Sequence, residues 1–183
     1  RDLLDMVKQY KDNGTFKKTI VLINSANVME VDWLDDYSID ACMWIGGPGT
    51  GSGIYGVADL LTGTANPSGK LVDTFSASSL SAPAMQNYVT AQNGYNDNLI
   101  YAEGIYVGYK YYETRYEDCV LGQGNASSSA GVYASQGGSW NYADEVTYPF
   151  GYGLSYTTFT QTLDSVTDNG DGTLTATVTV TNT

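Results

Sequence analysis

Apolar residues recur at spacings of three and four from Asp2 to Lys11, which predicts one amphipathic helix. The run Thr19–Ile23 is then almost continuously apolar, as in a strand that is buried on both faces of a parallel sheet. The pattern continues with a short helix over 28–34, a second buried strand over 39–45 and a helix over 53–61 that ends at Gly63. This alternation predicts an α/β fold with right-handed crossovers, a three-layer α/β sandwich with a mostly parallel sheet.

The pattern becomes less regular after Asn66-Pro67-Ser68-Gly69, which is a concentrated turn signal. Residues 71–75 predict a third strand or an extended segment in which the chain returns after the turn. The polar stretch 76–98 predicts a long surface loop. Residues 103–116 are aromatic and prone to form β-structure, whereas the Gly-, Ser- and Ala-rich stretch 122–141 predicts another exposed insertion.

Alternating Thr- and Val-rich runs close the chain and predict a β-hairpin. The runs cover 157–166 and 173–181, and Asp168-Asn169-Gly170-Asp171-Gly172 joins them. Two strands cannot bury a core by themselves, so we expect the start of an incomplete β-sandwich. The predicted organisation is therefore an α/β domain over residues 1–156 and the beginning of a β domain over 157–183.

Charge and composition exclude several classes of function. The 183 residues carry a net charge of −12, and only three basic residues follow Lys18, so nucleic acid and membrane surfaces are poor partners. The chain has no histidine, which removes the commonest zinc ligand and any Ser-His-Asp triad. No apolar run is long enough to span a bilayer. The many Tyr, Asn, Ser, Thr and Gly residues favour an extracellular or periplasmic protein.

The two cysteines lie in unlike surroundings and do not indicate a disulfide framework. Cys42 belongs to an apolar run and is expected to be a small buried hydrophobe, whereas Cys119 lies in a polar stretch. The chain begins at Arg1 without a methionine, which indicates a segment of a longer protein.

One motif suggests a dinucleotide site. Gly51-Ser52-Gly53-Ile54-Tyr55-Gly56 fits Gly-x-Gly-x-x-Gly, follows a predicted strand, opens a predicted helix and has Asp73 about 20 residues further on. Pro48 and Gly49 make the preceding loop longer than that motif requires, however, and the strand before it is not the first of the sheet. We therefore favour glycines that let a helix N-terminus approach the sheet closely, and we expect no cofactor.

Several separated segments, in a consistent order, resemble the C-terminal α/β sandwich domain of glycoside hydrolase family 3, the family of β-glucosidases and related exo-acting enzymes. The resemblance covers about residues 18–159. It rests on these segments: Trp44-Ile45-Gly46-Gly47-Pro48-Gly49, Ala58-Asp59-Leu60-Leu61-Thr62-Gly63, Asn66-Pro67-Ser68-Gly69-Lys70-Leu71, Tyr101-Ala102-Glu103-Gly104-Ile105-Tyr106-Val107-Gly108-Tyr109-Lys110-Tyr111-Tyr112 and Tyr148-Pro149-Phe150-Gly151-Tyr152-Gly153-Leu154-Ser155-Tyr156. In this family a fibronectin-III-like domain often follows at the point where the predicted hairpin begins, and Lys70 stands where a basic residue is usual.

The resemblance implies a retaining β-glycosidase that hydrolyses a β-linked glucoside or oligosaccharide with two carboxyl groups. It also implies that the nucleophilic Asp lies on a TIM-barrel domain outside this chain and that the acid/base Glu lies upstream of the matched segment. No residue of this chain matches either catalytic motif, so we assign no catalytic, cofactor or metal-binding residue and expect the chain alone to be inactive. A carbohydrate-binding or surface module without catalysis is the alternative, and a dinucleotide-binding α/β domain is the third reading.

A few residues remain as candidates for a direct role. Glu103 lies among tyrosines and could be a shielded acid, but a Glu before a Gly can equally accept backbone hydrogen bonds or pair with Lys110 or Arg115. Trp140 and Tyr142, in a Gly- and Ser-rich stretch, are the best candidates for exposed rings that stack on sugars, although most of the aromatic residues are expected to pack in a core. The sequences Asn13-Gly14-Thr15 and Asn125-Ala126-Ser127 match the N-glycosylation sequon.

Overall fold

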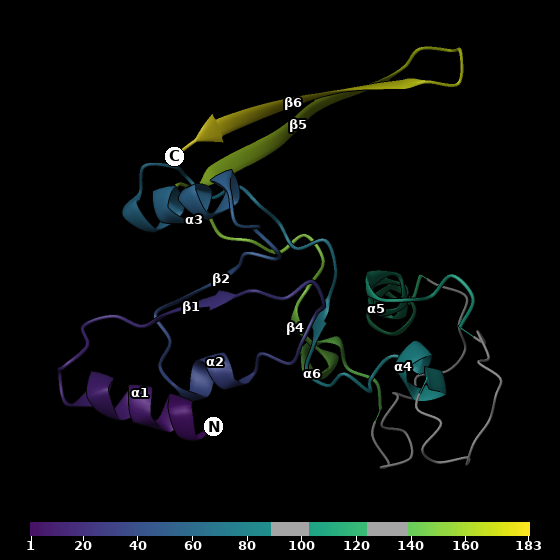
Figure 1. Ribbon diagram of the computed structural model, residues 1–183. Helices are drawn as coiled ribbons and strands as arrows, with labels where there is room; N and C mark the ends of the chain where they lie inside the picture. The colour runs from purple at the N-terminus through teal and green to yellow at the C-terminus, as the bar shows by residue number, and fades with distance from the viewer. Residues whose placement is uncertain (89–102, 124–138) are drawn as a thin grey trace.

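The computed structural model describes residues 1–88, 103–123 and 139–183 (Figure 1). The elements follow the order α1 (Asp2–Asp12), β1 (Ile20–Ile23), α2 (Trp33–Asp36), β2 (Ala41–Trp44), α3 (Ser52–Thr62), β3 (Phe75–Ser76), α4 (Pro83–Tyr88), α5 (Tyr109–Tyr116), the π-helical turn η2 (Glu117–Leu121), α6 (Tyr142–Glu145), β4 (Val146–Tyr148), β5 (Phe159–Asp168) and β6 (Leu174–Asn182). Within these ranges the strands form three two-stranded sheets, β1–β2, β3–β4 and β5–β6.

The parallel pair β1–β2 has α1 and α2 on one side and α3 on the other (Figure 1). Side chains alternate between the faces of a strand, and the β1 residue Ile23 packs with Val31, Leu34 and Phe75 in a buried cluster on the α2 side. Ile20 and Leu22 point to the other face and remain exposed. The prediction that β1 is buried on both faces is therefore wrong, because α3 on the other side does not cover Ile20 and Leu22.

Cys42 is also more accessible than its apolar surroundings indicated. It lies on β2, which pairs with β1 on one side and with no other strand among the described residues. Cys42 is exposed and Cys119 is half-buried, and no disulfide joins the two. The expectation of a buried Cys42 is therefore wrong.

Two of the predicted helices form nearly where the pattern placed them. Helix α1 covers the amphipathic segment, and α3 ends at Gly63, whose φ of 77° gives the left-handed conformation that glycine adopts without a Cβ penalty. Helix α2 begins at Trp33, later than the predicted start at residue 28.

The segment 71–75 does not extend the parallel sheet. Its end enters β3, which pairs antiparallel with β4 and places Phe75 opposite Tyr148. Among the described residues one of the three strand pairs is parallel, so the mostly parallel sheet of a complete three-layer sandwich stays a prediction.

Residues 103–116 were predicted to favour β-structure, but Tyr109–Tyr116 form helix α5. The prediction is wrong because tyrosine-rich sequence carries β-propensity only where it packs on a pleated surface. Here Tyr111 and Tyr112 are instead the buried residues of helix α5.

Strands β5 and β6 form the predicted hairpin, which extends away from the rest of the molecule (Figure 1). A β-bulge between Leu163 and Ser165 leaves Asp164 without a partner residue in the register. The bulge keeps the apolar residues of both strands on one face, and these residues are Phe159, Leu163, Val166, Leu174, Ala176, Val178 and Val180. The opposite face carries Asp164, whose Oδ2 accepts a hydrogen bond from Thr179 Oγ1 at 2.6 Å, and otherwise hydroxyl side chains: Thr160, Thr162, Ser165, Thr167, Thr175, Thr177, Thr179 and Thr181. Every residue of the two strands is exposed.

Two expected surface segments fall largely outside the described residues. Of the predicted loop over 76–98, the described part contains α4, and residues 89–98 lie outside the description. The insertion predicted over 122–141 is described only at its two ends. None of the helices in the described ranges combines the length and the hydropathy that a bilayer crossing requires.

Candidate functional site

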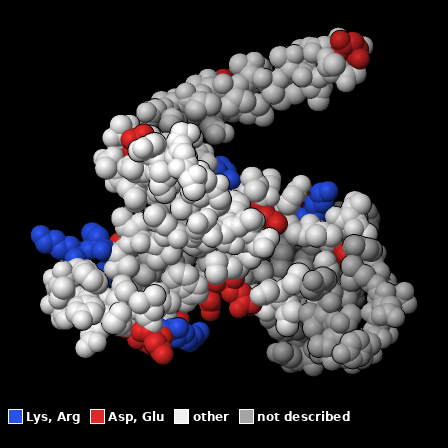
Figure 2. All heavy atoms as spheres, in the orientation of Figure 1, with Lys and Arg blue, Asp and Glu red and all other residues white. Residues whose placement is uncertain are grey.

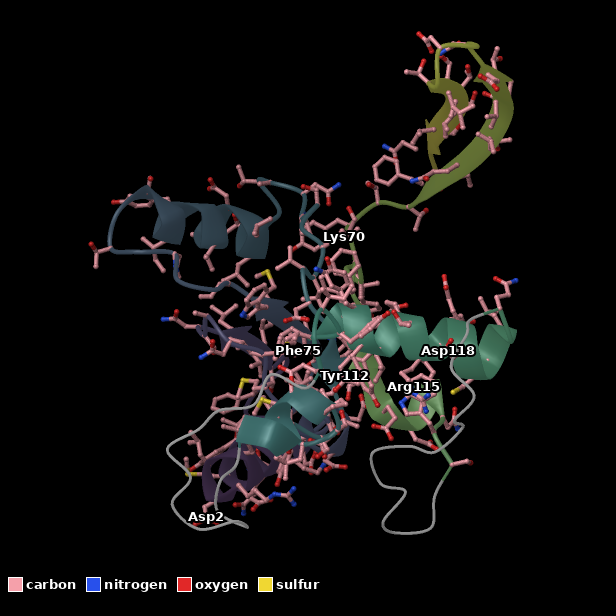
Figure 3. All side chains as sticks on the ribbon, turned by 90° about the vertical axis from the view of Figure 1, so that its right-hand side faces the viewer. Asp2, Lys70, Phe75, Tyr112, Arg115 and Asp118 are labelled. Atoms are coloured by element: carbon pink, nitrogen blue, oxygen red, sulfur yellow. The ribbon has the colours of Figure 1, made fainter. Side chains whose placement is uncertain are left out.

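Two of the sequence motifs meet where the chain passes from the α/β part to the hairpin. The amide of Leu71 donates to the carbonyl oxygen of Tyr152 at 2.8 Å, and the amide of Gly151 donates back to the carbonyl of Leu71 at 2.8 Å. The ammonium group of Lys70 donates to the carbonyl oxygen of Gly153 (Figure 3). The two segments are therefore held side by side although about 80 residues separate them in the sequence.

Asn66 connects the same two segments through its side chain. Its Oδ1 accepts hydrogen bonds from Ser155 Oγ at 2.8 Å and from the amide of Tyr156 at 2.9 Å. Its Nδ2 donates to Thr157 Oγ1 at 3.1 Å. The turn residue Asn66 thus binds three consecutive residues that lead into β5.

Asp73 joins the third motif to this junction. Its Oδ1 accepts hydrogen bonds from the amide of Thr74 at 2.8 Å and from the amide of Tyr109 at 3.1 Å, the first residue of α5. Gly108, at the helix N-cap, has no side chain that could accept this bond, so Asp73 caps α5 from a distant part of the sequence. The ring of Tyr109 stacks on Phe150 with a centroid distance of 4.3 Å.

A shallow hollow of about 450 Å³ lies at this junction. It is lined by Val72, Asp73, Gly104, Ile105, Val107, Gly108, Tyr109 and Lys110. Its rim is apolar and open, since Val72 is 66%, Ile105 70% and Val107 49% exposed. Asp73 is the single carboxylate among these described lining residues, so the hollow lacks the carboxyl pair that glycoside hydrolysis requires.

Glu103 lies next to this lining. It is partly buried, and its backbone carbonyl accepts a hydrogen bond from the amide of Tyr106 at 3.1 Å, which shapes the loop before α5. A direct role for Glu103 stays a prediction. Tyr101 of the same motif lies outside the described residues.

Trp140 and Tyr142 are not the exposed pair that their polar surroundings predicted. Trp140 is 5% exposed and Tyr142 is half-buried. The two rings pack edge to face at 6.0 Å, and the guanidinium group of Arg115 lies 5.5 Å from the centre of the Trp140 ring. The Tyr142 hydroxyl donates to Glu113 Oε1 at 2.8 Å. The prediction is wrong because residues of α5, remote in sequence, cover both rings.

Glu145 is the chemically notable residue that the sequence patterns did not reveal. It is 4% exposed, ends α6 and lies beside the tyrosine-rich face of α5. Burial, followed by the nearby charge of Asp144, raises the pKa of its carboxyl group above the ordinary value of 4.5, and the charge of Arg115 partly opposes this shift. The only sequence signal is an acidic residue directly before the apolar residue Val146, which is too common to indicate burial.

One glycine of the motif packs closely, but on the preceding loop rather than on the sheet as we expected, and Gly51 and Gly56 have no atom within 4 Å of an added Cβ. A Cβ atom built on Gly53 would lie 2.9 Å from the carbonyl carbon of Pro48 and closer still to its oxygen, so the start of α3 packs tightly on the preceding loop. Asp73 accepts hydrogen bonds from Thr74 and Tyr109 rather than standing beside this loop.

Surface features add little to the candidate site. Asn13 and Thr15 of the first sequon are exposed, and Asn125 of the second lies outside the described residues. Figure 2 shows the Lys and Arg side chains of one face as small separate groups, with no continuous basic patch on that face. Within the described ranges no cluster of three or more Cys, Asp or Glu side chains could hold a metal ion.

Comparison with known proteins identifies relatives for most of the chain. Residues 2–109 match the family model described as the glycosyl hydrolase family 3 C-terminal domain. The chain is 34% identical over 157 residues to a beta-glucosidase of Ruminococcus albus, which covers 84% of this chain and 13% of that protein. It is 35% identical over 159 residues to beta-glucosidase A of Butyrivibrio fibrisolvens, covering 84% of this chain and 15% of that protein.

A solved structure gives the same result at the level of the fold. Beta-glucosidase 3B of Thermotoga neapolitana, in complex with glucose, superposes with a TM-score of 0.65 at 30% identity. The superposition covers 99% of this chain and 21% of that protein. The chain thus spans about a fifth or less of the length of each of these three relatives.

Proposed function

The chain belongs to glycoside hydrolase family 3, as part of its C-terminal domain, and from this premise we propose that it is a supporting portion of a retaining, exo-acting β-glycosidase. The observation that carries the proposal is the match of residues 2–109 to the family's C-terminal domain, together with relatives that are named beta-glucosidases. In this proposal the substrate is a β-linked glucoside or oligosaccharide, and the whole polypeptide is the enzyme.

The chemistry of the described residues supports a division of labour. Retaining hydrolysis needs two carboxyl groups about 5 to 5.5 Å apart, one that attacks the anomeric carbon and one that acts first as acid and then as base. Asp73, the single carboxylate of the described hollow, already accepts two backbone N–H groups with one oxygen. We therefore propose that the nucleophile lies on a TIM-barrel domain and the acid/base residue upstream of the matched segment.

The same hollow supports a role in domain packing. Val72, Ile105 and Val107 form an apolar rim at a position that the junction of three motifs holds firmly. Apolar surface of this kind is stabilised when another surface covers it. We propose that the barrel domain packs here and that the chain thereby completes one wall of the substrate cleft. The β5–β6 hairpin then begins a fibronectin-III-like domain, whose remaining strands would cover the apolar face of the hairpin.

The first experiment measures nitrophenol release from an aryl β-glucoside by the complete protein and by residues 1–183 alone. We expect turnover by the complete protein and none by the 183-residue chain. Clear turnover by the chain alone would show that the catalytic carboxyl groups lie within it, and an inactive complete protein would contradict the proposal.

A matched pair of variants tests the proposed packing surface. Ile105→Asp in the complete protein places a charge on the rim of the hollow, whereas Ile54→Asp places it at a residue of α3 that is 49% exposed. We expect the first variant to lower activity and the second to leave it near that of the unmodified protein. Equal activity of the two variants would contradict packing at the hollow.

A carbohydrate-binding module without catalysis is the second candidate. The volume of the hollow is within the range of small-molecule sites, about 300 to 1,000 Å³, and this observation favours it. Retention of the chain on immobilised oligosaccharide gels, with no hydrolysis by the complete protein, would support this candidate over the first. Dinucleotide binding is disfavoured by the close packing of Gly53 on Pro48, and calorimetry with NAD would test it directly.

A further inference from the structure

The structure assigns a specific mechanical role to Asn66: we propose that this side chain clamps the segment that leads into the hairpin, so that the hairpin and the α/β part are joined by a fixed joint rather than by a flexible linker. Asn66 is the side chain that bonds to Ser155, Tyr156 and Thr157, three consecutive residues shortly before β5 begins at Phe159. Two of these bonds reach side chains and one reaches the backbone.

The chemistry of the amide explains why asparagine suits this position. Its oxygen accepts two hydrogen bonds while its NH₂ group donates a third, and an aspartate could accept the first two but could not donate to Thr157 Oγ1. A serine would be too short to reach three consecutive residues. Pro67, which follows Asn66, fixes one backbone angle of the turn and so limits the freedom of the clamp.

Neighbouring contacts hold the same joint from both sides. The Tyr156 hydroxyl donates to the carbonyl oxygen of Leu60 in α3 at 2.6 Å. A Cβ atom on Gly153 would lie 2.5 Å from the carbonyl oxygen of Gly69, so the two chain segments touch through their backbones. The joint is therefore a packed contact in which Asn66 supplies the bonds closest to the hairpin.

Hydrogen exchange measured by mass spectrometry on the complete protein tests the clamp. Asn66→Ala removes all three bonds, and we expect exchange in peptides covering residues 154–158 to become about tenfold faster or more, because each lost bond favours local opening. Asn141→Ala is the matched control, since Asn141 also accepts from a backbone amide, at 3.2 Å from Ala143, and donates to a side chain, at 3.0 Å from Asp144 Oδ2, but does so at α6.

The expected result is faster exchange at the joint in Asn66→Ala alone, with peptides of α1 and β1 unchanged in both variants. Chymotrypsin should also cleave after Tyr156, which is 59% exposed, more readily in that variant. Equal exchange at the joint in the two variants, or a parallel rise in every peptide, would overturn the proposal.

Milder variants keep the test decisive if Asn66→Ala does not fold. Asn66→Asp, Ser155→Ala and Thr157→Val each remove one donor or partner of the clamp. Each should accelerate exchange at residues 154–158 by a smaller factor than the complete loss. If none of the three changes the exchange of this segment, the clamp proposal is wrong.

Discussion

Replacing Gly53 by alanine should destabilise the protein, although alanine is the better helix former. The new Cβ atom would lie 2.9 Å from the carbonyl carbon of Pro48 and 3.2 Å from its Cα atom. A comfortable carbon–carbon contact needs about 3.5 Å, which alone asks for a separation of roughly 0.6 Å, and the still closer Pro48 carbonyl oxygen asks for more. Strain of this kind costs about 1 to 3 kcal/mol, whereas the gain in helix propensity is about 0.5 to 1 kcal/mol.

Gly56 provides the control within the same helix. A Cβ atom on Gly56 meets nothing within 4 Å, so Gly56→Ala keeps the propensity gain of about 0.5 to 1 kcal/mol without strain. Both variants gain the same helix propensity, so their free energies of unfolding should differ by the strain at Gly53 alone, about 2 kcal/mol. Urea unfolding followed by tryptophan fluorescence measures this difference. If Gly53→Ala is as stable as Gly56→Ala, the packing of α3 on the Pro48 loop is not the constraint that the structure indicates.

Three further predictions concern Glu145, Gly108 and Tyr142. The pKa of Glu145 is raised in the folded protein, so between pH about 4.5 and the folded pKa the folded protein binds more protons than the unfolded chain. The free energy of unfolding therefore falls as the pH rises through that range. Glu145→Gln should remove that fall, and melting temperatures recorded from pH 4 to pH 8 that show the same slope in both proteins would contradict this. Gly108→Ala should destabilise by about 1 to 3 kcal/mol because Gly108 has φ of 57° and its new Cβ would lie 2.6 Å from Asp73 Oδ1. Combining it with Asp73→Ala should cost less than the sum of the two single changes in a double-mutant cycle, and strict additivity would argue against direct contact. Tyr142→Phe removes the 2.8 Å hydrogen bond to a carboxylate and should cost about 1 to 2 kcal/mol in urea unfolding; an unchanged midpoint would show that this bond contributes nothing.

Local sequence patterns were sufficient to predict helices α1 and α3. The spacing of apolar residues predicted α1, and Gly63 marked the end of α3. The hairpin also followed from alternation and from its Asp- and Gly-rich turn. In each case the determining signals lie within one continuous stretch of sequence, the longest being the hairpin from Phe159 to Asn182.

The failures have a different physical origin. Helix α5 is capped by Asp73, and nothing near Tyr109 in the sequence reveals that cap. The burial of Trp140 depends on Arg115 and on the face of α5, whereas its own neighbours are small and polar. The exposed side of β1 depends on which elements cover it, which the apolar run itself does not specify.

The candidate site was only partly accessible from sequence for the same reason. The order of the motifs identified the family, and the comparisons confirmed it. The meeting of Asn66 with Ser155 and Thr157, across about 90 residues, appears only in three dimensions. The sequence identified Asn66 as part of a turn but could not indicate that its side chain would bind a remote segment.

The bulge at Asp164 makes β5 unequally tolerant of changes in length. Leu163 pairs with Val178 and Ser165 with Thr177, so loss of Asp164 alone would leave a regular strand in which every remaining residue keeps its side. Loss of a residue elsewhere in β5, with the bulge kept, would move every side chain beyond the deletion to the opposite face of the hairpin. Natural variation in the number of residues within this strand should therefore concentrate at one position.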